Sequence, residues 1–468
     1  MLQRSLFALA LFALALLVSA GAAFAKDTPN GDRASLPFML DAYPSTYRPG
    51  PSPDTIITGA TLLDGKGGRV EHASLRMRDG KIVAVGSDLQ LPAGATVIDA
   101  RGRFVTPGII DVHSHNGTYV SPLTSADEKT GDVSEDSDPN TANVWVEHGV
   151  QPHDPAFARA LAAGVTTLQI LPGSGNLFGG RSVVLKPVPA ATMQAMKFPA
   201  AKPGLKMACG DNPKNAGKFP TSRMGGVAGM RDAWVKAKAY IAKWEKYQRG
   251  GKGDVPDRDL KLDTLAAVLR GDILVHIHCY RSADLAVMLD LAAEFGYRVA
   301  AFHHAAEAYK VPALLRARGT CAAVWSDWWG WKMEVNDGIR ANAALLEAAG
   351  ACVMMHSDSP FTGQRLNMET AKAMASGRRA GIEIAPARAM RWITANPAKA
   401  LGLDDRIGTI EPGKNADVVI WSGDPFSVYT KADQVFVDGA LRFDRLDPAK
   451  QTPPADFELG QPAREDVR

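Results

Sequence analysis

Two histidines one residue apart follow a short apolar run near residue 110. The run reads GIIDVHSHNG and covers residues 108–117. Side chains at positions i and i+2 of a strand point to the same face, so His113 and His115 aim at one spot, with Asp111 on the same side. Two imidazoles can bind a metal ion or share a hydrogen-bond network. The rest of the chain must supply further ligands if a metal is the answer.

Other histidines gather in similar places. Seven of the chain's ten histidines end four strand-like runs: His113 and His115, then His276 and His278 in VHIHCYR, His303 and His304 in FHHAAEAYK, and His356 in MMHSDSP, which also holds Asp358. Imidazole and carboxylate ligands suit Zn²⁺ and similar ions, and a catalytic ion keeps an open position for water. A carboxylate beside that water can move its proton.

The elements that must position these residues follow a regular pattern. Apolar strand-like runs alternate with helix-like runs, and eight strands are expected, at 108–113, 165–171, 182–187, 204–208, 273–279, 298–303, 320–325 and 351–356. Eight is the number that a (β/α)8 barrel needs, and active sites of such barrels lie at the carboxyl ends of the strands. The later helix-like runs, such as SADLAVMLDLAAEFG, end in glycine, as a helix C-terminus prefers. The sequence therefore predicts an α/β fold with a TIM-like barrel.

Both ends of this central region have a different pattern. Short strands separated by Gly turns, such as TIITGATLLDG and ADVVIWSGDP, occur before and after the barrel, and RDGK is a hairpin turn signal. We expect one small β-sandwich built from both chain ends. The expected organisation is a signal peptide at 1–25, a linker at 26–53, a composite β-sandwich at 54–106 and 405–446, the barrel at 107–404 and a tail at 447–468.

Composition narrows the class of protein and its destination. The chain has 468 residues, is 46% hydrophobic and carries a net charge of +3, so bulk charge gives no case for nucleic acid or an anionic membrane as partner. An early Arg, an apolar stretch and an A-x-A site at Ala23–Ala25 predict a cleaved signal peptide. We expect an exported protein, periplasmic or secreted, with no stable membrane span; whether it forms a homo-oligomer is left open.

Four cysteines are scattered along the chain, and none forms a C-x-x-C pair. Each lies in or beside an apolar run, so we expect buried thiols rather than a disulfide framework: Cys209, Cys279, Cys321 and Cys352.

Several longer motifs carry a family resemblance. They are VTPGIIDVHSHNG, AAGVTTLQILPGSGN, HCYRSADL, HHAAEAYK, HSDSP and ITANPAKALGLDDRIGTIEPGKNADVVIWSGDP. They span nearly the whole mature chain. In these motifs the chain resembles the amidohydrolase superfamily, near its imidazolonepropionase and Xaa-Pro dipeptidase-like branch. The resemblance also implies a split β-sandwich beside a barrel.

The resemblance implies a ligand set for one or two divalent ions, with zinc the first expectation. The implied ligands are His113, His115, His278, His304 and Asp358, and Asp358 also serves as general base. His303 stands where an acid is common in the family, which is a departure.

The identity of the bridging ligand is left open by the sequence. Binuclear members of the family carry a bridging carboxylated lysine. Lys206 in GLKMACGDN is our first choice, Lys186 in SVVLKP is a rival, and Asp211 could supply an acid instead. If none of these bridges, the site is mononuclear.

Residues near the expected barrel mouth could bind the substrate. Arg181 in LPGSGNLFGGRSVV could bind a carboxylate, and Asn176, Tyr280 and Arg281 are further choices. The segment WSDWWGWK places four tryptophans together and reads as a stacking wall or as packing under a lid. A Gly-rich turn with a surface Arg is the plain alternative for Arg181.

The leading hypothesis is a metal-dependent hydrolase that cleaves a C–N bond of a small-molecule substrate, either a small peptide or a cyclic amide. Metal-activated water would attack, and Asp358 would act as the general base. The alternatives are a mononuclear deaminase or cyclic-amide hydrolase and, less favoured, a non-catalytic binding protein on a degenerate barrel. A deaminase would carry an acid soon after its fifth-strand His, whereas here the first, Asp284, comes six residues after His278.

Overall fold

A computed structural model of the chain describes residues 41–119, 121, 129–250, 254–328 and 330–447. The predicted signal peptide, most of the linker and nearly all of the tail lie outside these residues. The strands and the site described below belong to one compact unit, Leu40–Ile241 with Asp257–Arg468. Within the described part of the chain, no helix combines the length and the apolar character that crossing a membrane requires.

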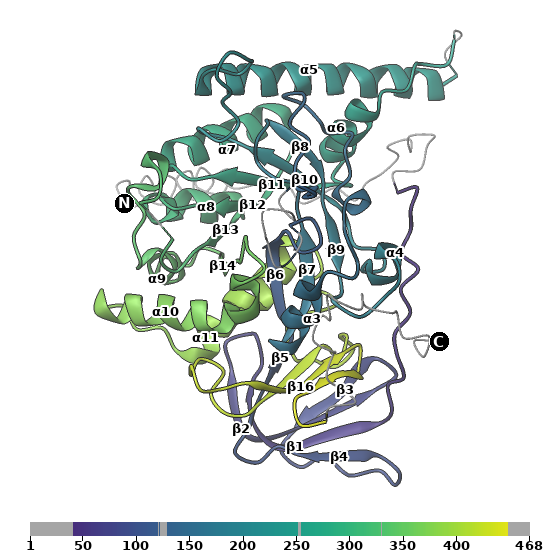
Figure 1. Cartoon of the computed structure of the whole chain (residues 1–468), viewed down its shortest axis with the longest axis vertical. Helices are drawn as coiled ribbons and strands as arrows, with labels where there is room; N and C mark the ends of the chain where they lie inside the picture. The colour runs from purple at the N-terminus through teal and green to yellow at the C-terminus, as the bar shows by residue number, and fades with distance from the viewer. Residues whose placement is uncertain (1–40, 120, 122–128, 251–253, 329, 448–468) are drawn as a thin grey trace, which may run out of the picture. The chain divides into compact units, whose positions relative to one another are not determined.

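The two ends of the chain build one mixed sheet of eight strands, as Figure 1 shows in purple and yellow. Its order is β17-β16-β15-β5-β1-β2-β3, with β4 beside β1. The strands are β1 (Thr55–Leu63), β2 (Arg69–Arg78), β3 (Lys81–Gly86), β4 (Thr96–Asp99), β5 (Phe104–Pro107), β15 (Val418–Trp421), β16 (Ala432–Val437) and β17 (Ala440–Asp444). The second layer expected of a sandwich stays a prediction.

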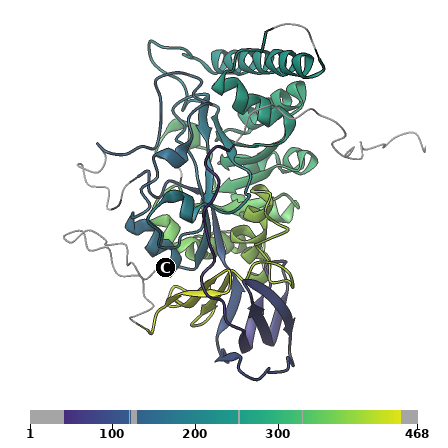
Figure 2. The same ribbon diagram turned by 90° about the vertical axis from the view of Figure 1, so that its right-hand side faces the viewer.

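Two tight turns hold the hairpins of this sheet. Asp79-Gly80 joins β2 to β3, and Asp438-Gly439 joins β16 to β17. All four residues have positive φ, between 47° and 78°, which is the backbone of a type I′ turn. The hairpin predicted from RDGK is therefore confirmed. Figure 2 shows from the side how strands from the two chain ends lie next to each other.

The central strands form a curved wall, called the strand wall below. It comprises β6 (Ile109–Ser114), β7 (Val165–Ile170), β8 (Phe178–Arg181), β9 (Val183–Leu185), β10 (Gly204–Ala208), β11 (Leu274–Cys279), β12 (Val299–His304), β13 (Cys321–Val324) and β14 (Val353–Met355). Nearly all of their residues are buried. The pairing orders are β6-β7-β9 and β14-β13-β12-β11-β10-β8. β14 lies against β6, but no hydrogen-bonded ladder closes the wall there within the described residues.

The third wall segment departs from the expected parallel strand at 182–187. It consists of β8 and β9, and it runs antiparallel to both neighbours, β7 and β10. The reason is the short connection after β7, which ends at Ile170 only a few residues before β8 begins. A parallel return needs a crossover of about a dozen residues or more, whereas a short connection turns the chain back on itself.

Helices cover the outside of the strand wall, with α7, α8 and α9 beside β12, β13 and β14 (Figure 1). Gly296 and Gly319 end α7 and α8 in the left-handed conformation, as their sequences predict. The helices are α3 (Pro155–Ala162), α4 (Met193–Met196), α5 (Arg223–Gln248), α6 (Leu260–Arg270), α7 (Ser282–Phe295), α8 (Pro312–Arg318), α9 (Asn342–Ala348), α10 (Leu366–Arg379), α11 (Pro386–Met390) and α12 (Ala395–Ala400). Short 3-10 turns are η1 (Val146–His148), η2 (Ala308–Lys310), η3 (Met333–Val335), η4 (Thr362–Arg365) and η5 (Arg391–Ile393).

The prediction of four buried thiols is wrong. Cys209 bonds to Cys279 and Cys321 bonds to Cys352, with Cα–Cα distances of 5.2 and 4.5 Å. Each bond joins neighbouring wall segments, β10 to β11 and β13 to β14. Sequence separations of 70 and 31 residues hide this proximity, which depends on which strands pair.

Candidate metal centre

The histidine-bearing runs meet at one end of the strand wall. The ends of β6, β11 and β12 and the segment after β14 bring their imidazoles together, and the exposed fraction of each ring's residue is 4% or less: His113, His115, His276, His278, His303, His304 and His356. The four histidine-bearing runs therefore lie together, as expected from their positions at strand ends.

One group of ligands centres on a carboxylate oxygen. Oδ1 of Asp358 lies 3.2 Å from Nε2 of His113 and 3.1 Å from Nε2 of His115. The two Nε2 atoms are 3.3 Å apart. Three ligand atoms on three side chains therefore point at one small volume, as the His-x-His spacing predicts.

A second group also includes His113. His113, His304 and His356 each offer a ring nitrogen, and these atoms lie within 4.8 Å of one another. Nε2 of His356 is 3.1 Å from Nδ1 of His304 and accepts a hydrogen bond from the His304 backbone N–H at 3.2 Å. The ring of His278 is 4.4 Å from that of His304 by centroids. Two adjacent groups that share His113 can accommodate one ion or two.

The two lysines considered as bridging ligands lie in different surroundings. Lys206, on β10, is 1% exposed, and its Nζ lies 3.4 Å from Nε2 of His113 and 3.0 Å from the Pro172 carbonyl. Lys186 is equally buried but forms ion pairs with Asp417 at 3.1 Å and Asp438 at 3.0 Å, beside the mixed sheet. Only Lys206 is near the imidazoles.

The donor set fits a metal ion. Both ring nitrogens of His278, and Nδ1 of His356, are buried without a hydrogen-bond partner among the described residues. Buried polar atoms normally have partners because leaving them without one costs free energy. The unpartnered ring nitrogens of His278, which lies beside His304, are atoms that a divalent ion would satisfy.

Protonation also suits metal binding. Burial lowers the pKa of His113, His278 and His304 well below the ordinary value for histidine. Burial acts to raise the pKa of Asp358, but the neighbouring imidazoles of His304 and His115 outweigh it and hold that pKa well below its usual range. Neutral imidazoles and an ionised carboxylate are the forms that bind metals.

The backbone is bent to aim two of these ligands. His304 has φ 71° and Asp358 has φ 54°, both in the left-handed region that side chains other than glycine rarely adopt. The turn before Asp358 is held by Asp111, which accepts hydrogen bonds from the Ser357 hydroxyl at 2.5 Å and the Ser357 N–H at 3.2 Å. Asp111 thus fixes the turn that presents Asp358.

An aromatic wall borders the ligands. The ring of Trp325 lies 4.4 Å from that of His304, and Trp328 stacks on Trp325 at 5.1 Å. Tyr280 lies 4.6 Å from His278 and 5.4 Å from His304. Trp325 and Trp328 line a small pocket together with His304. Tyr280 is thus next to the centre, and two tryptophans of WSDWWGWK form one side of it.

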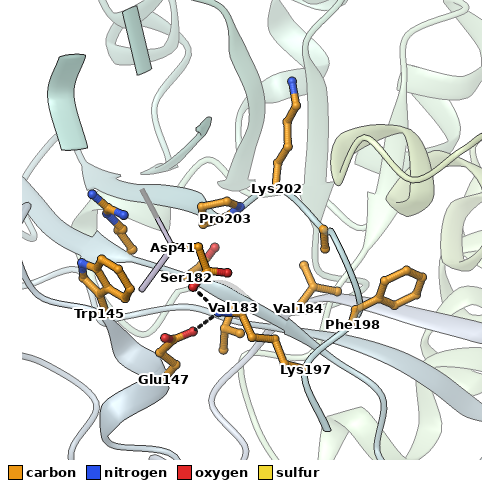
Figure 3. A pocket seen from close by; sticks show the side chains of 12 residues that line it. Asp41, Trp145, Glu147, Ser182, Val183, Val184, Lys197, Phe198, Lys202 and Pro203 are labelled. Atoms are coloured by element: carbon orange, nitrogen blue, oxygen red, sulfur yellow. Dashed lines mark hydrogen bonds and ion pairs between the residues drawn. The ribbon is translucent and has the colours of Figure 1, made fainter. Parts of the chain in front are cut away.

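Arg181 is elsewhere. It pairs with Leu205 across β8 and β10, so its side chain is on the face opposite to that of Lys206. Its Nε donates to the Thr264 hydroxyl at 2.8 Å and its guanidinium lies over Trp145. It lines a second pocket, shown in Figure 3, where Lys197 forms ion pairs with Asp41 and Glu147. The expectation that Arg181 contacts the substrate at the metal centre is not supported.

Two further predicted contacts have structural partners. The side-chain amide of Asn176 donates to the Glu135 and Asp138 carbonyls and the Thr141 hydroxyl, so it holds the loop before β8. Arg281 pairs with Asp211 at 2.7 Å and lies 3.8 Å from Glu334. Asp211 is therefore engaged by Arg281, and neither residue is among the side chains of the two ligand groups.

Sequence reasoning assigned no role to some residues of the centre. His356 and His303 contact the ligands His304 and His113, His276 contacts His303, and Asp111 with Ser357 supports Asp358. The doublets H-x-H and H-H were the available signal, because alternate residues of a wall strand point inward together. The backbone conformation of Asp358 left no trace in the sequence.

Comparison with known proteins agrees with this geometry. The model of the Amidohydrolase family matches residues 104–444. The amidohydrolase tasK of Hapsidospora irregularis is 31% identical over 401 residues, which cover 80% of this chain but 39% of that protein. The chain thus spans well under half of this relative. An imidazolonepropionase of Acidiphilium cryptum is 26% identical over 389 residues, covering 76% of this chain and 88% of the relative.

Solved structures give the same picture. An amidohydrolase from Thermotoga maritima MSB8 superimposes with a TM-score of 0.77 at 33% identity, over 84% of this chain and all of that one. A putative prolidase from Bifidobacterium longum, at 17% identity and TM-score 0.52, covers 84% of this chain and 95% of its own and shares the fold.

Proposed function

Since this chain belongs to the amidohydrolase family, we propose that it is a metal-dependent hydrolase that cleaves a C–N bond. The observation that carries the proposal is the convergence of His113, His115 and Asp358 within 3.3 Å of one another, beside further buried imidazoles without partners. The wall, with its third segment reversed, serves as the family's (β/α)8-type barrel.

The residues that would hold one or two divalent ions are those already predicted. They are His113, His115, Lys206, His278, His304 and Asp358. A bound divalent ion, zinc by ligand type, would make water a stronger acid and polarise the carbonyl of the scissile bond. His356 lies behind His304 and holds its ring and its backbone N–H.

Asp358 has the position and the charge of a general base. Its side chain is 26% exposed, whereas those of His113 and His115 are 1% and 5% exposed. It therefore faces the open side of the centre. Its low pKa keeps it ionised, so it can take a proton from water and pass it to the leaving nitrogen.

Lys206 is our choice for the bridging ligand. Burial lowers its pKa to about 8, so a neutral amine is accessible near pH 7–8. The Lys206 cation first releases one proton. The neutral Nζ can then attack carbon dioxide, so that an N–C bond forms as one C=O π bond breaks, and the loss of a second proton leaves a carboxylated anion. That anion would offset the charge of the ions and satisfy the position beside His113.

The aromatic wall supports a planar cyclic amide over a dipeptide as substrate. A carboxylate-binding Arg181 at the centre would have favoured a small peptide, but its side chain lies on the face of the wall opposite to Lys206. Tyr280, Trp325 and Trp328 offer flat faces beside His304. The name imidazolonepropionase, borne by a relative, denotes an enzyme for such a ring, whereas prolidase denotes a peptidase.

Export is part of the proposal. The A-x-A leader sequence and two disulfide bonds agree with a periplasmic or secreted protein, because disulfides persist in oxidising compartments. Fractionation of the producing cells, with N-terminal sequencing of the mature chain, tests this. A chain that begins after Ala25 outside the cytoplasm is expected, and an uncleaved cytoplasmic chain would contradict it.

The activity is tested by stripping the protein with a chelator and restoring Zn²⁺, Mn²⁺ or Co²⁺. Each form is assayed on cyclic amides, dipeptides with C-terminal proline, and aminated heterocycles. We expect ring-opening hydrolysis only in the restored forms. Ammonia release from heterocycles without amide hydrolysis would favour a deaminase, and a protein that neither binds ions nor hydrolyses any of these would be a binding protein.

A further inference from the structure

Three imidazoles form a hydrogen-bonded chain under the centre. Nδ1 of His113 lies 3.1 Å from Nδ1 of His303, and Nε2 of His303 lies 2.9 Å from Nδ1 of His276. All three residues are 0% exposed and come from different strands, β6, β12 and β11. The proposed reaction uses only the first of them.

We propose that His303, held by His276, is a positioning residue that sets which nitrogen of His113 carries the proton. The inference rests on the proposed function, because it concerns how His113 is prepared to bind an ion. It adds a role for two residues to which the reaction gives none.

The argument follows from counting donors. A neutral imidazole has one N–H and one acceptor nitrogen, and a ring must be neutral to bind an ion through one nitrogen while the other nitrogen donates a hydrogen bond. Each of the two contacts needs one donor, so the chain has two proton arrangements. In one, His113 donates to His303 and His303 donates to His276. In the other, His276 donates to His303 and His303 donates to His113.

Only one arrangement suits a metal ligand. If His113 donates from Nδ1 to His303, its Nε2 keeps a lone pair for the ion, and His303 in turn donates from Nε2 to His276. The reverse arrangement places a proton on Nε2 of His113, which then faces Oδ1 of Asp358 at 3.2 Å and cannot bind an ion. Binding an ion at His113 therefore selects one direction along all three rings.

The neighbouring ligand, His115, shows by contrast why the proton position on His113 depends on a further residue. Nδ1 of His115 lies 2.9 Å from the Leu171 carbonyl, which can only accept, so the proton of His115 is fixed on Nδ1. The partner of His113 is an imidazole, which can accept or donate. The state of His113 is therefore decided by His303, and that of His303 by His276.

The fold makes room for the end of this chain. His276 pairs with Lys206 across β11 and β10, so both face the interior of the wall. A Cβ at Gly204 would lie 2.6 Å from Oγ of Ser182, 2.8 Å from Cδ2 of the His276 ring and 2.9 Å from Nε2 of Gln169, all closer than such atoms pack. Nε2 of His276 has no hydrogen-bond partner among the described residues, so it can carry the proton of that ring when Nδ1 accepts from His303.

The test compares three variants by zinc affinity, measured by competition with a chromophoric chelator, without any substrate. His303→Leu removes both hydrogen bonds and should weaken binding by about 10–100-fold. His303→Gln keeps an acceptor toward His113 and a donor toward His276, and should stay within a few-fold of the wild type. Gly204→Ala keeps every histidine but crowds His276 together with Ser182 and Gln169, and should give an intermediate loss.

Thermal melting of the ion-free forms checks that each variant is folded, and the Co²⁺ form of each variant completes the experiment. In the ¹H NMR spectrum of the Co²⁺ protein, the signal of the exchangeable N–H proton of His113 should be present in the wild type and in His303→Gln, and lost in His303→Leu. Equal affinities in all forms, or equal losses in the Leu and Gln variants, would overturn the inference. Normal ion binding without C–N hydrolysis would instead overturn the proposed function alone.

Discussion

The two ends of the strand wall each bury a lysine and carry a disulfide, yet the surroundings of the two lysines differ. At one end, Lys186 faces two carboxylates, Asp417 and Asp438. At the other, Lys206 faces an imidazole and a carbonyl, and no ion pair to it occurs within the described residues. Both lysines are 1% exposed.

The difference indicates that the two buried lysines have different roles, one in stability and one in ion binding. A buried ammonium is tolerated where carboxylates offset its charge, as at Lys186, which joins the wall to the mixed sheet. A buried amine without such partners does not stabilise the fold, so its presence indicates a functional role, here as the precursor of a carboxylated lysine. We therefore expect changes near Lys206 to alter ion binding and turnover, and changes near Lys186 to alter stability.

The largest effect is expected at the Lys206 end, from Asp358→Asn. Asparagine keeps the shape of the side chain but cannot accept a proton, so kcat/KM should fall by about 10²–10⁴-fold. Thermal melting should change little. Steady-state kinetics of the Zn²⁺-restored protein measure this, and full activity in the variant would remove Asp358 as the base.

The Lys186 end should respond to Lys186→Met with a loss of stability. Removing the cation leaves Asp417 and Asp438 buried and unpaired, which should lower the free energy of unfolding by about 3–5 kcal/mol. Urea unfolding followed by circular dichroism measures the change. The folded fraction should keep its zinc content; a loss of zinc at unchanged stability would reverse the comparison.

The two disulfides sharpen the contrast, since one lies at each end. Cys209→Ser with Cys279→Ser, and the matched pair Cys321→Ser with Cys352→Ser, should each cost about 2–5 kcal/mol, more for the bond that closes the longer loop. Only the first pair should also weaken zinc binding, because Cys279 follows His278 and the Cys209 N–H donates to the His278 carbonyl at 2.9 Å. Equal zinc affinities in both double variants would contradict this.

The smallest effect concerns pH. Burial raises the pKa of Asp417 from an ordinary 3.8 to about 6. The negative charge of Asp438 also acts to raise this pKa, and the positive charge of Lys186 acts to lower it. The folded state holds this proton more tightly than the unfolded state, so the contribution to stability is full below pH 4 and is lost as the pH rises through 6. The loss should be at most about 3 kcal/mol. Unfolding curves between pH 4 and 7 should lack this step in Asp417→Asn.

Much of the metal centre could be predicted because the positions of its residues follow from local sequence patterns. The period of two on strands placed His113 with His115, and the runs at His278, His304 and Asp358 followed from strand ends that share one edge of a wall. The alternation of strands and helices gave the α/β class. These inferences need only the direction in which consecutive residues point.

The rest depended on pairings that no local pattern encodes. The reversal of β8 and β9 turned Arg181 away from the centre, and the neighbours of β10 and β13 determined which cysteines meet. Lys186 and Lys206 look alike in sequence, and only the position of Asp417, more than 200 residues away, distinguishes them.

The most direct test of the account is the metal content of the purified mature protein beside Lys206→Met and Lys186→Met. The account predicts about two divalent ions per chain in the wild type and in the folded fraction of Lys186→Met, and a loss of bound ions in Lys206→Met. One ion per chain, unchanged by either substitution, would contradict the bridging role of Lys206.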